Sequence, residues 1–431
     1  HGFAPLIQTN RGCPFSCAYC CSGTRYYDKV NFFSIQRVKE EIGYLSRHAK
    51  SHFVHLHDDN FGMFDRDYYI CKIFKKVQNK NGWPVFIRAE TGKNSPDKII
   101  KCMRLLGDSL LFSASVQTMS RPALEKINRR NIASEALISV QKEIKQLGCN
   151  TNSDLILPLP GETVKSHLAA IKVLMSIGID HISPYTTMLL TASPLHEDGK
   201  FKKERMMVKY RVIPRGFGIY ENKHVVEVEK VCVGTINLSL DDYIFLRSVH
   251  FIIYSCYNGE TLKELFSFLQ SYSCQPFELC YAMATRIDSA PQRFRKIFER
   301  FIVDTRKELW GSEKDIFDYY AKDINFKKLV HLHKGCNLLH RYRGIIFSSH
   351  FDTMIEYAFK TALAILSEKG IECEVGAAEA IKSYILGCKN RVLDLNNEDI
   401  ILELPYDIHD WKLKGYNRPL ESYRWQVRVK F

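Results

Sequence analysis

Cysteines crowded near the start of the chain are the residues best placed to do chemistry. The chain has 14 cysteines, and four of them, Cys13, Cys17, Cys20 and Cys21, lie within residues 13–21. The first three follow a Cys-x-x-x-Cys-x-x-Cys spacing in the run RGCPFSCAYC. Three thiolates on one short loop can face one metal centre. Neighbouring side chains diverge, so we expect Cys21 to be structural.

The spacing of Cys13, Cys17 and Cys20 favours an iron–sulfur cluster. A structural zinc site takes four ligands, usually from paired Cys-x-x-Cys halves, whereas this spacing is unequal and no second pair follows nearby. A [4Fe–4S] cluster has four irons, so three cysteines leave one iron open to bind something else. An open position suits chemistry rather than structure. We therefore expect these cysteines to hold one [4Fe–4S] cluster, with zinc as the alternative.

The elements around this loop alternate between strand and helix over the first 190 residues. Strands with helices between them predict an α/β fold with a parallel sheet, either a partial barrel or an open sheet. The strand patterns cover residues 5–9, 53–57, 85–89, 110–117, 154–157 and 181–188. The helix patterns cover residues 34–48, 65–80 and 95–106, a helix capped by Ser134 that ends at Gly148, and a run from Thr163 to near Gly178.

The pattern changes near residue 200. We expect domains at residues 1–195 and 241–431, joined by a β-containing connector at 196–240. The connector reads as a β-pair, residues 206–213 and 225–233, around a Gly-rich turn at 215–218. The last domain reads as mainly helical to about residue 386, and strand-like runs follow at 400–404 and 425–430.

The cysteine spacing, with the aromatic Tyr19 before the third cysteine and a strand before the loop, resembles the radical S-adenosylmethionine (radical SAM) superfamily. The resemblance covers about residues 1–195 and implies a partial (β/α)6, TIM-like barrel. It also implies that the open iron chelates the amino and carboxylate groups of S-adenosylmethionine (SAM). One electron from the cluster then cleaves the sulfonium and yields a 5′-deoxyadenosyl radical. Tyr19 counts among the SAM contacts that the resemblance implies.

Further SAM contacts are implied at the ends of the next strands. Asp58, Asp59 and Asn60 (HDDNFG) end the second strand, where the family holds the methionine amino group. The alternative for these residues is an N-cap of the helix at 65–80.

Two more strand ends add candidate SAM contacts. Arg88 (FIRAE) ends the third strand and could hold the methionine carboxylate or the ribose, or pair with Glu90. Ser115 and Gln117 (SVQT) end the fourth strand, where the family places ribose and carboxylate contacts. Their alternate positions predict that they share one face of the strand.

The fifth strand and its turn, DLILPLPGE, also resemble the family. We expect Pro160, Gly161 and Glu162 to shape the turn rather than to do chemistry. Pro158 stands where the family often has Gly. We name no catalytic residue.

The combination of motifs is similar to radical SAM proteins with an upstream, flavodoxin-like cobalamin-binding domain. The chain starts at His1, shortly before the first strand, so we expect that domain to be missing from it. No Asp-x-His-x-x-Gly cobalamin-ligand pattern is present in the chain. The resemblance implies cobalamin-dependent methyl transfer to a small-molecule substrate, or rearrangement of that substrate.

Two other functions stay open. One is a methylthiotransferase acting on tRNA or protein, a group that usually adds a small β-barrel after the radical domain. The other is an iron–sulfur protein that transfers electrons or binds RNA without radical chemistry. Conversion of SAM to 5′-deoxyadenosine separates the enzymes from the second class.

The amino-acid composition excludes some classes of protein. The 431 residues are 45% hydrophobic and 25% charged, which excludes a disordered, collagen-like or coiled-coil chain. The net charge of +13 permits nucleic acid, but no long basic run stands out, so a solvated surface is favoured. No apolar stretch is long enough to span a bilayer, and no signal peptide is visible.

From these features we expect a cytoplasmic enzyme reduced by a partner such as flavodoxin or ferredoxin. One further metal candidate lies late in the chain, in the run HLHKGCNLLH. It comprises His331, His333, Cys336 and His340. We expect these side chains to be solvated rather than metal-bound.

Overall fold

The computed structural model describes residues 3–92, 95–113, 115–197, 199–331, 335–393 and 401–431. These residues divide into two compact units. Unit 1 is His1–Tyr210 with Glu229–Tyr243, and unit 2 is Arg211–Val228 with Ile244–Phe431. The stretch expected as a separate connector is therefore shared between the two units.

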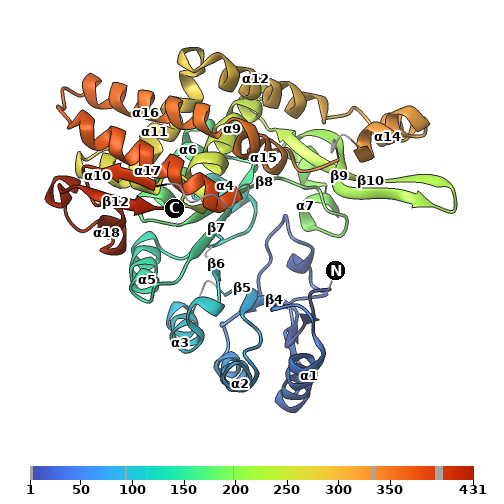
Figure 1. The fold of residues 1–431 in the computed structure, drawn as a ribbon. Coiled ribbons are helices and arrows are strands. Elements are labelled where there is room, and N and C mark those ends of the chain that lie inside the picture. The colour runs from blue at the N-terminus through green and yellow to red at the C-terminus, as the bar shows by residue number, and fades with distance from the viewer. Residues whose placement is uncertain (1–2, 93–94, 114, 198, 332–334, 394–400) are drawn as a thin grey trace. The chain divides into compact units, whose positions relative to one another are not determined.

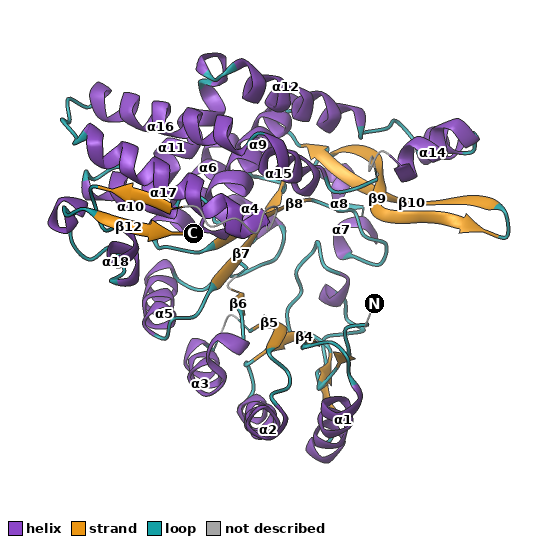
Figure 2. Ribbon diagram, in the orientation of Figure 1, coloured by secondary structure: helices purple, strands orange, loops and turns teal. Residues whose placement is uncertain are grey.

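Parallel strands form the centre of unit 1 (Figures 1 and 2). One sheet has the order β1-β4-β5 and another has the order β6-β7-β8, and each neighbouring pair is parallel. A parallel bridge between Ile87 and Leu110 joins β5 to the segment before β6. This confirms the predicted α/β partial-barrel fold class. The strands are β1 (Leu6–Ile7), β4 (Phe53–Phe61), β5 (Phe86–Thr91), β6 (Phe112–Ser113), β7 (Thr151–Leu157) and β8 (His181–Thr186).

Helices follow these strands much as the apolar periodicity predicts. The hydroxyl of Ser34 accepts a bond from the Arg37 N–H at 3.2 Å and caps the first helix, whose Val38 and Ile42 are fully buried. Short elements escaped the sequence patterns because a single turn or a two-residue strand has no period. The predicted helices are α1 (Ile35–His48), α2 (Asp65–Asn81), α3 (Pro96–Leu106), α5 (Ser134–Gln146) and α6 (Val164–Ser176); the unpredicted elements are β2 (Asn10–Arg11), β3 (Asn31–Phe32), α4 (Arg121–Lys126), α7 (Pro194–Glu197) and α8 (Lys200–Lys203).

The β-pair expected after residue 200 is a long hairpin of β9 (Met207–Tyr220) and β10 (Lys223–Gly234). Its turn is at Glu221 and Asn222, whose φ angles are +48° and +62°, so the prediction of a turn at residues 215–218 was wrong. A two-residue hairpin turn of this kind needs two positive φ angles in succession, and Asn tolerates that conformation well.

Unit 2 is mainly helical, as predicted (Figure 2). Its aromatic core includes Phe251 and Phe301, whose rings stack with centroids 4.5 Å apart, and Tyr342 packs edge-on against both. None of the helices in the described residues combines the length and apolar composition that a membrane crossing needs. The helices are α9 (Leu240–Ile252), which begins at the end of unit 1, α10 (Lys263–Ser271), α11 (Pro276–Thr285), α12 (Gln292–Lys307), α13 (Glu313–Tyr320), α14 (Asp323–His331), α15 (Leu338–Ser349), α16 (Phe351–Glu368), α17 (Val375–Leu393) and α18 (Ile408–Leu413); β11 (Ile401–Leu404) pairs antiparallel with β12 (Val427–Lys430).

Candidate active site

The cysteine loop is an excursion between two short strands of unit 1. β2 and β3 pair antiparallel, with Arg11 opposite Asn31, and so close the base of the loop. Gly12 lies at φ +116°, and a Cβ there would collide with the carbonyl oxygen of Lys29. Glycine is therefore required just before the first cysteine, where the two arms of the loop meet.

Backbone contacts fix the loop further along. The N–H of Cys13 donates to the Tyr27 carbonyl at 2.8 Å. The N–H of Ala18 donates to Ile127 at 2.9 Å, and the Ala18 carbonyl accepts from Leu195 at 2.6 Å. Ala18 is fully buried in a small apolar cluster. The loop therefore has a defined shape that rests on the body of unit 1.

Cys13, Cys17 and Cys20 all line one cavity of about 880 Å³. That volume is within the range of sites for cofactors and small ligands. The cavity lies where the loop meets the carboxyl ends of the strands, the usual place for active sites in barrels of this type. Its other walls include Tyr19, Ser22, His55, His57, Asp58, Asp59, Asn60, Arg88, Glu90, Gln117, Asn128, Arg129 and Arg130.

The shared cavity of the three thiols fits a [4Fe–4S] cluster. Among the described residues, no three His, Cys, Asp or Glu side chains gather closely enough to hold one metal ion. A zinc ion needs every ligand atom within about 2.3 Å of itself, whereas a [4Fe–4S] cluster takes each thiolate on a separate iron. The three cysteines share one cavity, as the ligands of a [4Fe–4S] cluster must.

Burial makes the thiols of Cys13 and Cys20 reluctant to ionise without metal, because it raises the pKa of each. The negative charge of the nearby Asp59 carboxylate raises both pKa values further. Hydrogen bonds from the Phe15 backbone and from Asn60 oppose the rise at Cys13. Binding iron requires thiolates, so loading of the site releases protons and is favoured as pH rises.

The carboxylate of Asp58 holds the start of the loop instead of facing a ligand. It accepts bonds from the N–H groups of Thr9 at 2.7 Å and Asn10 at 3.2 Å, and from the Asn10 amide at 3.0 Å. A bond from the Thr9 hydroxyl completes its shell. Asp58 is 2% exposed and also borders the cavity.

Asp59 and Asn60 present their side chains to the cavity. Asp59 accepts a bond from the Ser22 hydroxyl at 3.3 Å, and Asn60 donates to the Cys13 sulfur at 3.2 Å. The N-cap alternative for this run was wrong. α2 begins at Asp65, and the carboxylate of Asp67 accepts the Phe64 N–H at 3.1 Å at that helix start.

Gln117 and Ser115 do not share one face of the strand, contrary to the prediction. Gln117 lines the cavity at φ +64°, while Ser115 is 2% exposed and its hydroxyl donates to Asp154. The prediction assumed a regular strand, but β6 ends at Ser113 and Gln117 itself has a left-handed backbone conformation. Arg88 lines the cavity as expected. The SAM contacts assigned to these residues stay predictions.

Arg129 is the main site residue that the sequence patterns missed. Its guanidinium donates to the Tyr19 hydroxyl at 2.9 Å, to the Ser115 carbonyl at 2.6 Å and to the Cys17 sulfur at 3.6 Å. Burial raises the pKa of the Tyr19 hydroxyl, and the Arg129 charge opposes that rise. The signal in the sequence was the basic pair in INRRN, which follows the unpredicted helix α4.

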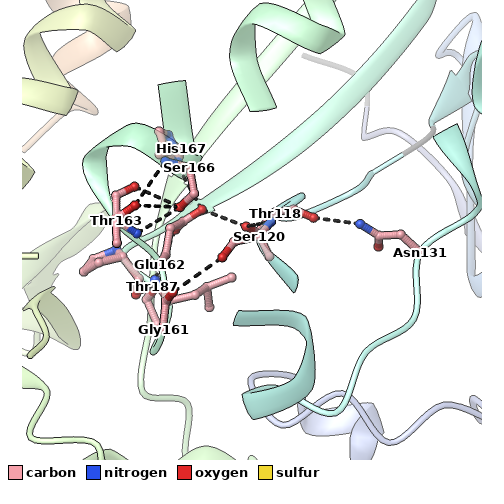
Figure 3. Close-up of polar contacts among 11 residues, drawn as sticks. Thr118, Ser120, Asn131, Gly161, Glu162, Thr163, Ser166, His167 and Thr187 are labelled. Atoms are coloured by element: carbon pink, nitrogen blue, oxygen red, sulfur yellow. Dashed lines mark hydrogen bonds and ion pairs between the residues drawn. The ribbon is translucent and has the colours of Figure 1, made fainter. Parts of the chain in front are cut away.

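A chain of hydrogen bonds leads from Arg129 into the protein, and its part from Asn131 to His167 is drawn in Figure 3. The Arg129 Nε donates to the Asn131 side-chain oxygen at 3.0 Å, and the Asn131 amide donates to the Thr118 carbonyl at 2.7 Å. The Thr118 hydroxyl donates to Glu162 at 2.7 Å, and Glu162 is fully buried beside His167. Glu162 therefore shapes the site, as expected, rather than reaching the cavity.

The remaining sequence candidates lie elsewhere. The Cys21 thiol donates to the Thr191 carbonyl at 3.4 Å, a structural contact. In unit 2, His340 lies 3.1 Å from the Tyr254 hydroxyl. His333 lies outside the described residues.

Comparison with known families agrees with this site. Residues 7–174 match the model of the Radical SAM superfamily, so the chain contains a radical SAM domain. The two cofactors predicted from the sequence, a [4Fe–4S] cluster and SAM, are those of this domain.

Several curated proteins resemble the chain. It is 28% identical over 267 residues to 2-(S-pantetheinyl)-carbapenam-3-carboxylate methyltransferase of Streptantibioticus cattleyicolor, and 27% identical over 264 residues to the cobalamin-dependent radical SAM methyltransferase TokK of Streptomyces tokunonensis. Each match covers 59% of this chain and 38% of the relative, so the chain spans under two fifths of their length. A Helicobacter pylori protein assigned as a methylthiotransferase is 26% identical over 190 residues, covering 42% of this chain and 43% of that protein.

Among solved structures, the radical SAM methyltransferase TsrM of Kitasatospora setae matches with a TM-score of 0.41 and 13% identity. That match covers 49% of this chain and 41% of TsrM.

Proposed function

We propose that this chain is the radical SAM part of an enzyme that methylates a small molecule with the help of cobalamin. The observation that carries the radical SAM part is the shared cavity of Cys13, Cys17 and Cys20 at the strand ends. When bound, the reduced cluster supplies the electron that cleaves SAM. The three thiolates would hold the cluster, since they line one cavity.

The charges on the cavity wall complement those of SAM. The methionine part of SAM carries an ammonium group and a carboxylate. The wall offers the Asp59 carboxylate for the ammonium and the Arg129 guanidinium for the carboxylate. Charge-assisted hydrogen bonds of this kind are the strong ones, and Arg suits carboxylates in particular. Gln117 offers an amide for the ribose hydroxyls, and Arg88 lies on the same cavity.

Cobalamin and methyl transfer rest on the two methyltransferase relatives, one of which is named as cobalamin-dependent. We assign no residue of this chain to cobalamin. We further propose an upstream cobalamin-binding domain in the whole protein, a cytoplasmic location and a flavodoxin- or ferredoxin-type reductant. Free thiols at all 14 cysteines suit a reducing compartment.

The test is made on the full-length gene product, purified and reconstituted without oxygen. Reduced protein with SAM is expected to release 5′-deoxyadenosine or S-adenosylhomocysteine, and the protein is expected to contain cobalamin. A Cys13→Ala variant serves as the control for background cleavage. Absence of SAM cleavage by an iron-loaded protein would instead support an electron-transfer or RNA-binding protein.

A methylthiotransferase is the second candidate, favoured by the Helicobacter relative. It predicts a tRNA or protein product that carries sulfur as well as a methyl group. Mass spectrometry of the product separates the two, since a methyltransferase product contains no added sulfur. Turnover of the complete protein without cobalamin would also argue for the second candidate.

A further inference from the structure

The amide of Asn60 touches a cysteine sulfur. Its Nδ2 donates to the Cys13 sulfur at 3.2 Å, and the residue is 8% exposed. Asn60 comes one residue before the end of β4, whereas Cys13 belongs to the loop after β2. The contact therefore joins the barrel to the loop across 47 residues of chain.

Both partners are held in place by their surroundings. On the side of the strand, Phe61 is fully buried, and the Asn60 carbonyl accepts from the Met63 N–H at 3.3 Å. On the side of the loop, the Cys13 N–H is bonded to Tyr27.

Hydrogen bonds beside this contact tie the same two segments of the chain together. The Asp58 carboxylate, two residues before Asn60, accepts the backbone N–H groups of Thr9 and Asn10, four and three residues before Cys13. The same strand end thus fastens the start of the loop and touches its first cysteine. The backbone on both sides of the N–H···S contact is therefore held by the fold.

A hydrogen bond to a ligand sulfur changes the energetics of an iron–sulfur cluster. Reduction adds an electron, so negative charge on the cluster and its thiolates increases. A donor N–H aimed at a thiolate stabilises the more negative state, and hydrogen bonds to the sulfurs are among the factors that set cluster potentials. We propose that Asn60 is a positioning residue that donates to the Cys13 thiolate and raises the cluster's reduction potential.

The inference rests on the proposed function, because it needs the cluster. It differs from the role that the sequence suggested for Asn60, contact with the SAM amino group. The two roles are separable, since a SAM contact has no effect on a cluster measured without SAM.

The experiment is a redox titration of the reconstituted, SAM-free cluster, followed by electron paramagnetic resonance. We expect a more negative midpoint potential in Asn60→Ala. We expect a larger shift in Asn60→Asp, which keeps the shape, loses the donor and adds a charge. Gln117→Ala is the matched control, since Gln117 is another amide on the cavity wall, and it should leave the SAM-free potential unchanged. Iron content and circular dichroism check that each variant is loaded and folded.

The outcomes separate this inference from the proposed function. A wild-type protein that assembles no cluster refutes the proposed function. Wild-type iron content with an unchanged potential in both Asn60 variants refutes the inference alone. If Asn60→Ala assembles no cluster, the isosteric Asn60→Asp decides, and a potential at or above the wild-type value refutes the inference.

Discussion

Gln117 allows stability and ligand binding to be separated at one position. It faces the cavity in the left-handed region, at φ +64°, where a side chain is strained and glycine is not. Its backbone is held there by a bond from its N–H to the Asp154 carbonyl and one from the Ile156 N–H to its own carbonyl, both 2.8 Å. The fold therefore imposes the strain. We predict opposite effects of Gln117→Gly on folding and on SAM affinity.

The magnitudes follow from the backbone and the lost amide. Relief of the left-handed conformation stabilises the folded state by roughly 1–2 kcal/mol. The extra freedom of glycine in the unfolded chain offsets about 0.5–1 kcal/mol of this gain. With the central values of these two ranges, Gln117→Gly should be about 0.8 kcal/mol more stable than Gln117→Ala. Loss of a hydrogen bond to a charged ligand costs about 1.5–3 kcal/mol, so both variants should bind SAM roughly ten- to a hundredfold more weakly.

Urea unfolding of the metal-free protein measures the first effect, and equilibrium dialysis of SAM against the reconstituted protein measures the second. Iron content should equal that of the wild type in both variants. Equal stability of the Gly and Ala variants would refute the strain argument. An unchanged dissociation constant for SAM would show that the amide shapes the cavity without contacting the ligand.

Three further predictions concern the loop. Changing Cys13, Cys17 or Cys20 to Ala should abolish cluster assembly, whereas Cys21→Ala should keep the wild-type iron content, and equal iron loss in all four would contradict the ligand assignment. Asp58→Ala leaves the backbone N–H groups that it binds without an acceptor, at a cost of about 1–3 kcal/mol each, and Asp58→Asn should cost less; urea unfolding decides. The raised pKa of Cys13 and Cys20 keeps these thiols protonated near neutral pH, so iron incorporation should accelerate as pH rises toward the alkaline range. A rate of incorporation independent of pH, followed by absorbance under anaerobic conditions, would contradict that reasoning.

Local sequence patterns predicted much of unit 1. The helix at residues 34–48 was recognised from apolar residues three and four positions apart, and the structure has α1 at Ile35–His48 with Ser34 as its N-cap. These signals are local, because a cap and an amphipathic stripe depend on residues within a few turns. The cysteine spacing is local in the same sense, since one loop carries the thiols that line the cavity.

Tertiary structure decided how the side chains around that loop are used. Asp58, Asp59 and Asn60 are consecutive, yet the first ties down the chain, the second faces the cavity and the third touches a cysteine. Arg129 reaches the site because Asn131, Thr118 and the buried Glu162 hold its segment against the loop. These contacts join residues far apart in the sequence, so no short-range pattern encodes them, and only the packing of strands and loops selects which polar group meets which partner.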